Sequence, residues 1–131
     1  MEKLLPPLTH SSRPFYEGCN QNELRLQYCA KCKIYQFYPR IICNSCGDDS
    51  ISWIRASGRA TLLSFTVVRR SLTEAYEAPY TVILALLEEG PTMMSQLVGE
   101  PGSCSIGDSL LVEFVEWGAE LKLPLFRKIE E

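Results

Sequence analysis

Four cysteines stand in two matched pairs within one short stretch of this 131-residue chain. Cys29 and Cys32 form the first C-x2-C pair, Cys43 and Cys46 form the second, and ten residues separate the two pairs. Two tight turns that each present two sulfur atoms suit the tetrahedral coordination of one metal ion by four thiolates. The spacing therefore predicts one structural zinc ion in a closed ligand shell. Iron in a rubredoxin-like site uses the same four sulfurs and is the less favoured alternative.

Two alternatives compete with a metal site in this stretch, namely disulfides and four unrelated core cysteines. Neither explains why the cysteines are paired on both sides of the ten-residue segment. The N-terminal residues lack an apolar run like that of a signal peptide, and the run near Val82–Leu87 is too short to span a bilayer. We therefore expect a cytoplasmic protein without membrane spans, a setting in which disulfides are rare.

The segment before the first cysteine pair predicts an arm, a short helix and a strand. Pro14 suits the first turn of a helix, and Phe15, Gly18 and Cys19 follow at helical spacing. From 23 to 28, leucine and tyrosine alternate with arginine and glutamine, which is typical of a strand. The only histidine, His10, is expected to be solvated in the arm.

Between the cysteine pairs, β-branched and aromatic residues surround Pro39 and predict a hairpin that brings the second pair back to the first. We expect Ile34 and Ile41 to cover this ribbon, whereas the aromatic residues Tyr35, Phe37 and Tyr38 face either the ribbon or a partner. A module this small has little apolar core, so the metal is expected to supply most of its stability.

From Gly58 onward, five strand-like segments alternate with Gly- and Pro-containing turns, which predicts a small closed barrel. An OB-fold is the common five-stranded solution, and an SH3-like barrel is the second choice. The long first strand after Gly58 fits an OB barrel, because that strand bends to join both sheets. The predicted fold is thus mainly β, with an arm and short helix over 1–23, a rubredoxin-like zinc ribbon over 24–57 and the barrel over 58–131.

Several segments, in the same order, give the chain a family resemblance. They are RPFYEG, LRLQYCAKC, PRIICNSCG, SGRATLLSFTVVRR, EAPYTVILALLEEGPTMMSQLVG, IGDSLLVEF and LPLFR. Together they resemble the family that joins a rubredoxin-like zinc ribbon to an acyl-CoA-associated OB-fold, long catalogued as a domain of unknown function. Lys33 and Asn44 stand where the family often has Gly and Pro, a difference expected to loosen the turns without removing a ligand.

The resemblance implies a non-catalytic, zinc-binding subunit that partners a thiolase or a hot-dog-fold enoyl-CoA hydratase and sits near the acyl-CoA. A thiolase that cleaves a bulky 3-oxoacyl-CoA from an aromatic or steroid-like compound is the favoured partner. The sequence is consistent with a non-catalytic role, since it contains no paired acid and base, no nucleophile elbow and no phosphate-cradling loop. The remaining cysteines, Cys19 and Cys104, lack a histidine partner and are expected to be inert.

Contact with the partner or with acyl-CoA is assigned to exposed aromatic and basic residues. The irregular loop from Arg69 to Pro79 is the first candidate, and the contact residues expected in this chain are Phe37, Arg40, Arg69, Arg70 and Tyr76.

A nucleic-acid-binding module is an alternative of another class, and a one-electron iron carrier is a third. Residues 24–59 hold six Lys or Arg against two Asp, but residues 60–131 hold five against eleven Asp or Glu, which disfavours a nucleic-acid groove on the barrel. The ribbon's basic residues form either a solvated face or a contact for CoA phosphates or the partner: Arg25, Lys31, Lys33, Arg40, Arg55 and Arg59.

Overall fold

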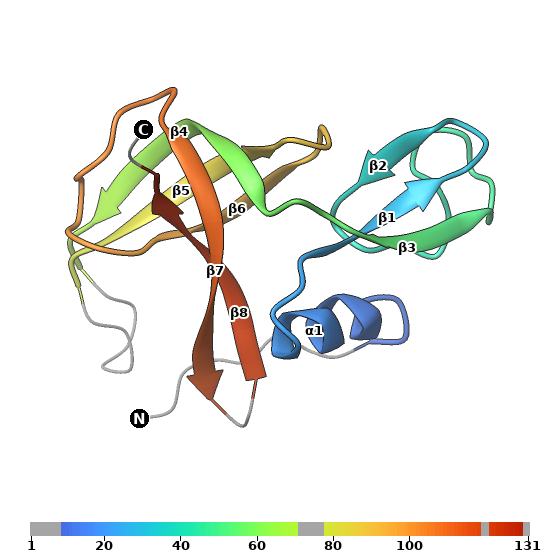
Figure 1. Cartoon of the computed structure of the whole chain (residues 1–131), viewed down its shortest axis with the longest axis horizontal. Coiled ribbons are helices and arrows are strands. Elements are labelled where there is room, and N and C mark those ends of the chain that lie inside the picture. The colour runs from blue at the N-terminus through green and yellow to red at the C-terminus, as the bar shows by residue number, and fades with distance from the viewer. Residues whose placement is uncertain (1–8, 71–77, 119–120, 130–131) are drawn as a thin grey trace.

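The computed structural model describes residues 9–70, 78–118 and 121–129 and arranges them as one helix, a three-stranded sheet and a closed five-stranded barrel (Figure 1). This mainly β fold, in this order, confirms the predicted fold class. The helix is α1 (Arg13–Asn20). The sheet contains β1 (Arg25–Cys29), β2 (Ile34–Gln36) and β3 (Ile51–Arg55). The barrel contains β4 (Arg59–Val68), β5 (Tyr80–Leu87), β6 (Thr92–Leu97), β7 (Ser109–Gly118) and β8 (Leu121–Lys128).

Helix α1 begins where Thr9 and Ser12 bond to one another. The N–H of Ser12 donates to Oγ1 of Thr9 at 3.1 Å, and the N–H of Thr9 donates to Oγ of Ser12 at 3.0 Å. Pro14 follows in the first turn, where a backbone N–H has no acceptor within the helix, so the missing N–H of proline removes no helical hydrogen bond. After the helix Asn22 takes a φ of 61°, which reverses the chain into β1. In the described part of the chain no helix is long and apolar enough to cross a membrane.

The small sheet has the antiparallel order β2–β1–β3, and its hairpin lies elsewhere than predicted. β1 turns back into β2 at the first cysteine pair, so that Cys29 lies opposite Ile34. Residues 37–50 contain no strand and return toward the first pair as a loop (Figure 1). Pro39 lies in this loop and has no N–H to give to a strand ladder, which agrees with the absence of pairing there.

The prediction that Ile34 and Ile41 cover the ribbon is wrong, because their exposed fractions are 40% and 76%. The space between β1, β2 and the returning loop is filled by the side chains of Gln27 and Gln36, both of which are buried. These amides bond to the backbone of the loop, as described below. An isoleucine in that space would leave those backbone groups without partners.

The barrel has the strand order β4–β5–β6–β8–β7, and β4 closes it by pairing with both β5 and β7. A bulge between Leu62 and Ser64 bends β4, as the OB prediction requires. Gly58 precedes this strand with a φ of 83°, and a Cβ there would lie 2.6 Å from Cγ1 of Val112, so the close approach of β4 to β7 needs glycine.

One hydrophobic core joins the helix, β1 and the barrel. Phe15, Tyr16 and Cys19 of α1 contact the same cluster as Leu24 and Leu26, and α1 lies between β8 and β1 (Figure 1). Ala56 lies between β3 and β4, and the barrel contributes the other buried members, which are Ala60, Leu62, Ile83, Ala85, Leu87, Met93, Leu97, Leu110, Leu121 and Phe126. The ribbon is therefore tied to the barrel through the helix that precedes it.

Candidate metal centre

The two cysteine pairs lie in turns of the same construction. In the first turn the N–H of Lys33 donates to the carbonyl of Cys29 at 2.7 Å, and Lys33 has a φ of 60°. In the second turn the N–H of Gly47 donates to the carbonyl of Cys43 at 2.9 Å, and Gly47 has a φ of 76°. Each turn thus ends in a left-handed residue directly after its second cysteine, a conformation that glycine adopts more readily than lysine.

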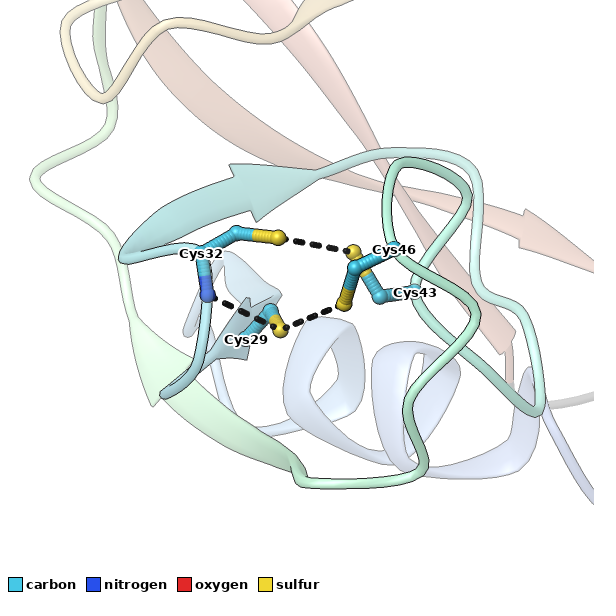
Figure 2. A group of neighbouring side chains, drawn as sticks. All are labelled: Cys29, Cys32, Cys43 and Cys46. Carbon is cyan, nitrogen blue, oxygen red and sulfur yellow. Dashed lines mark hydrogen bonds between the residues drawn. The ribbon is translucent and has the colours of Figure 1, made fainter.

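The structure brings together all four cysteines that the spacing singled out (Figure 2). Their sulfur atoms all lie within 4.8 Å of one another, with Cys29 and Cys46 3.7 Å apart and Cys32 and Cys43 3.9 Å apart. Four sulfurs placed tetrahedrally at about 2.3 Å from one ion are separated by roughly 3.8 Å. The cluster therefore has the dimensions of a tetrathiolate metal site, and the separations are far above the ~2.05 Å of a disulfide.

Backbone donors favour the thiolate form at these turns. The N–H of Cys32 points at Sγ of Cys29, and the N–H of Ser45 points at Sγ of Cys43, both at 3.4 Å. The backbone N–H groups of Cys46 and Ser45 lower the pKa of Cys43 to about 7. Hydrogen bonding to Cys46 is the main cause that raises the pKa of Cys32 to about 12. Four neighbouring thiols cannot all ionise without a compensating cation, and a divalent metal ion supplies that charge.

Two buried glutamines hold the loop that carries the second cysteine pair. Nε2 of Gln27 donates to the carbonyl of Arg40 at 2.7 Å, and Oε1 of Gln27 accepts from the N–H of Arg40 at 2.8 Å. Oε1 of Gln36 accepts from the N–H of Asn44 at 3.0 Å, next to Cys43. These side chains replace the strand pairing that the loop lacks. Gln27 and Gln36 thus fix the position of the second turn relative to the first.

Sequence reasoning missed Gln27 and Gln36 as positioning residues. The alternation of apolar and polar residues around Gln27 indicates a strand. It does not reveal that the loop over residues 37–50 covers the polar face of that strand. A glutamine on a ribbon strand is a weak signal by itself, since most glutamines are exposed.

The predicted contact residues do not gather in one place. Phe37 lies 5.2 Å from Phe15, measured between ring centroids, and Arg40 is exposed on the ribbon loop. Arg69 and Arg70 follow β4 in the chain, and the C-terminal end of that strand lies on the side of the barrel away from the ribbon (Figure 1). Tyr76 lies outside the described residues.

The basic residues of the ribbon are partly neutralised by acids. Glu23 forms ion pairs with Arg25 at 2.9 Å and with Arg55 at 3.7 Å, and Lys31 lies 3.7 Å from Asp48. Half of the six basic residues considered above therefore have an acidic neighbour. This pairing weakens the interpretation of the ribbon as a phosphate-binding patch.

Comparison with known families divides the chain within β3, shortly before the barrel begins. Residues 17–52 match the family model described as the rubredoxin-like zinc ribbon domain of ChsH2, and residues 53–115 match its C-terminal OB-fold domain. A solved chain described as "Ltp2-ChsH2(DUF35) aldolase" superposes with a TM-score of 0.86 at 31% identity, covering 95% of this chain and 98% of that one.

Curated relatives carry two kinds of name. The "Probable enoyl-CoA hydratase alpha subunit" of Thermomonospora curvata is 32% identical over 123 residues, which are 93% of this chain but only 39% of that protein. The "DUF35 domain-containing scaffold protein" of Methanothermobacter thermautotrophicus is 34% identical over 89 residues, which are 66% of this chain and 67% of that protein. The chain thus spans about two fifths of the hydratase-named relative.

Proposed function

This chain belongs to the ChsH2 family of zinc-ribbon and OB-fold proteins, and we propose that it is a non-catalytic, zinc-binding subunit of an acyl-CoA enzyme. The favoured partner is a thiolase-type enzyme that cleaves a bulky 3-oxoacyl-CoA during breakdown of an aromatic or steroid-like compound. The two would form a cytoplasmic hetero-oligomer in which this chain helps to hold the acyl-CoA.

The similarity to a solved chain of the Ltp2–ChsH2(DUF35) aldolase is the observation that carries this proposal. That chain and this one correspond over nearly their full lengths, from the ribbon through the barrel. The name of the solved protein joins this kind of chain to a second protein, and the name of the Methanothermobacter relative is that of a scaffold. Both names support a role in assembly.

The two cysteines outside the metal cluster support a role without a nucleophile. Cys19 is buried, and burial raises its pKa to about 12. Burial and the charge of Asp108 also raise the pKa of Cys104. A catalytic thiol has its pKa lowered, because the thiolate is the attacking form. The reacting cysteine and its base would therefore come from the partner.

We further propose that Cys29, Cys32, Cys43 and Cys46 hold one Zn²⁺. Four thiolates close the shell and leave no position for water or substrate, which makes the ion structural. The sulfur separations support this assignment, and the zinc ribbon match favours zinc over iron. A ferric tetrathiolate is coloured and zinc is not, so visible absorption distinguishes the two.

A hydratase partner is the second candidate, since the Thermomonospora relative is named as a hydratase subunit. The nucleic-acid alternative has no comparable support among these relatives, and the ion pairs of the ribbon count against it.

The test is gel filtration and an activity titration with any thiolase and any enoyl-CoA hydratase that are encoded beside this chain. We expect a stable complex with one of them, and acyl-CoA turnover that rises with added chain and saturates at a fixed ratio. The isolated chain should turn over no acyl-CoA. Full activity of both enzymes without this chain, or no complex at micromolar concentration, would overturn the accessory role.

A further inference from the structure

A groove of about 390 Å³ lies where the helix, the ribbon loop and the barrel meet. We call it the junction groove and define it by its lining residues: Phe15, Tyr16, Phe37, Tyr38, Met93, Met94, Ser95, Gln96, Trp117, Leu123, Pro124 and Leu125. Small-molecule sites span roughly 300–1,000 Å³ and favour the junctions of structural units. The junction groove meets both conditions.

The groove exists because β6 and β8 pair over a very short stretch. The two strands are parallel, and their ladder is confined to the partners Leu97 and Phe126. Toward Ser95 a side chain takes the place of the ladder, since Oγ of Ser95 donates to the carbonyl of Pro124 at 2.7 Å. Pro124 has no N–H to extend the ladder, so the strands separate there and leave an apolar opening beside α1.

The lining is mostly aromatic and aliphatic, and it is free of charge. None of the residues that define the groove is ionised at neutral pH, although 22% of the chain is charged. Aromatic faces and methionine side chains pack well on flat hydrocarbon rings. A charged group placed there would lose its hydration without a compensating partner, so the nucleotide part of CoA is excluded.

Two tyrosine hydroxyls give the groove a polar point. The hydroxyl oxygens of Tyr16 and Tyr38 lie 3.2 Å apart and bond to one another. Burial raises the pKa of Tyr16, so its hydroxyl stays protonated. When one hydroxyl donates to the other, the second keeps a proton that can bond to an oxygen of a ligand.

We propose that the junction groove binds the uncharged, ring-bearing acyl end of the substrate thioester, an inference that rests on the function proposed above. The tyrosine pair then bonds to an oxygen on that acyl group, and the charged CoA portion lies outside. The isolated chain would hold the hydrocarbon part weakly, and the partner enzyme would hold the CoA part.

The wall formed by Phe37 and Tyr38 belongs to the ribbon. This pair begins the loop that Gln27 holds at Arg40 and that Gln36 holds at Asn44. The groove is therefore complete only when the loop that carries the second cysteine pair is in place. Removing the metal should weaken the groove without touching its barrel side.

The isolated chain can be tested with N-phenyl-1-naphthylamine, an uncharged aromatic probe whose fluorescence rises in apolar surroundings. We expect saturable binding, displacement by a cinnamoyl thioester of N-acetylcysteamine, and no displacement by free CoA. Tyr38→Ala and Met94→Glu change side chains that are 43% and 68% exposed, so both variants should fold. Each should weaken probe binding by about tenfold or more.

Ile106→Ala is the matched control, because Ile106 is 70% exposed and does not line the groove. Equal probe affinity in all four proteins, or displacement by CoA alone, would overturn the assignment. The assignment would also be overturned if the wild-type chain did not bind the probe while Met94→Glu no longer bound the partner enzyme. The groove would then be a protein interface. Absence of a complex with the wild-type chain overturns the proposed function instead, whatever the probe does.

Discussion

Nε2 of Gln36 donates a 2.7 Å hydrogen bond to Oε1 of Gln27 across the β1–β2 pair, where the two residues are register partners. Both side chains are buried, and each then reaches the backbone of the loop over residues 37–44. A buried amide network of this kind is favourable only when all its members are satisfied. The metal ribbon is thus held by two systems, the four sulfurs on one side and the glutamine pair on the other.

Replacing one proposed ligand should remove the metal. We expect Cys43→Ser to bind less than one equivalent and to lose ribbon structure, because structural zinc in small modules contributes on the order of 10 kcal/mol or more. Elemental analysis and circular dichroism measure these effects. Cys104→Ser is the control, since this thiol lies outside the cluster. A full equivalent of tightly held metal in Cys43→Ser would show that the ligand assignment is wrong.

Removing the polar atoms of Gln36 should loosen the second turn while leaving every cysteine in place. In Gln36→Leu, the N–H of Asn44 and Oε1 of Gln27 each lose a partner, and we expect a loss of roughly 2–3 kcal/mol in unfolding free energy. A chelator should then extract the metal faster than from the wild type. Gln21→Leu is the exposed control and should change neither quantity measurably. An unchanged rate of metal release in Gln36→Leu would show that Gln36 does not position the second turn.

Lys33 and Gly47 occupy equivalent positions at the ends of the two turns, and we expect substitutions at these two positions to change stability in opposite directions. Lys33→Gly should stabilise the protein by about 0.5–1 kcal/mol, because glycine adopts a φ of 60° without strain. Gly47→Ala should destabilise it by a similar amount, on the order of 1 kcal/mol. Nothing lies within 4 Å of a Cβ at Gly47, so the backbone alone sets that cost. Urea denaturation of the metal-loaded protein measures both, and equal signs would contradict the shared turn geometry.

Thiol labelling should separate the two spare cysteines from a catalytic thiol. At pH 8 the native protein should react with iodoacetamide more slowly at Cys104 than a free thiol does, because its pKa is raised. Cys19, buried with a pKa of about 12, should react only after unfolding. Mass spectrometry of timed samples gives both rates. Rapid labelling of either residue at neutral pH would point to an activated thiol and contradict the non-catalytic role.

Local patterns in the sequence were enough to predict the metal turns and the barrel strands. The spacing of Cys29 and Cys32, and of Cys43 and Cys46, places two sulfurs on one tight turn whatever surrounds it, because a C-x2-C segment is closed by its own backbone bonds. Turn residues such as Gly90 and Gly107 separate the barrel strands in the same local way.

Burial of particular side chains was decided only by the tertiary structure. Whether Gln27 is hidden and Ile41 exposed depends on which distant segment covers each face, and the sequence near either residue does not contain that information. The junction groove has the same origin. It requires Pro124 to end a ladder with β6, α1 to lie beside the opening, and Tyr38 to approach from the ribbon. These segments are far apart in the chain, and only packing around a common core brings them together.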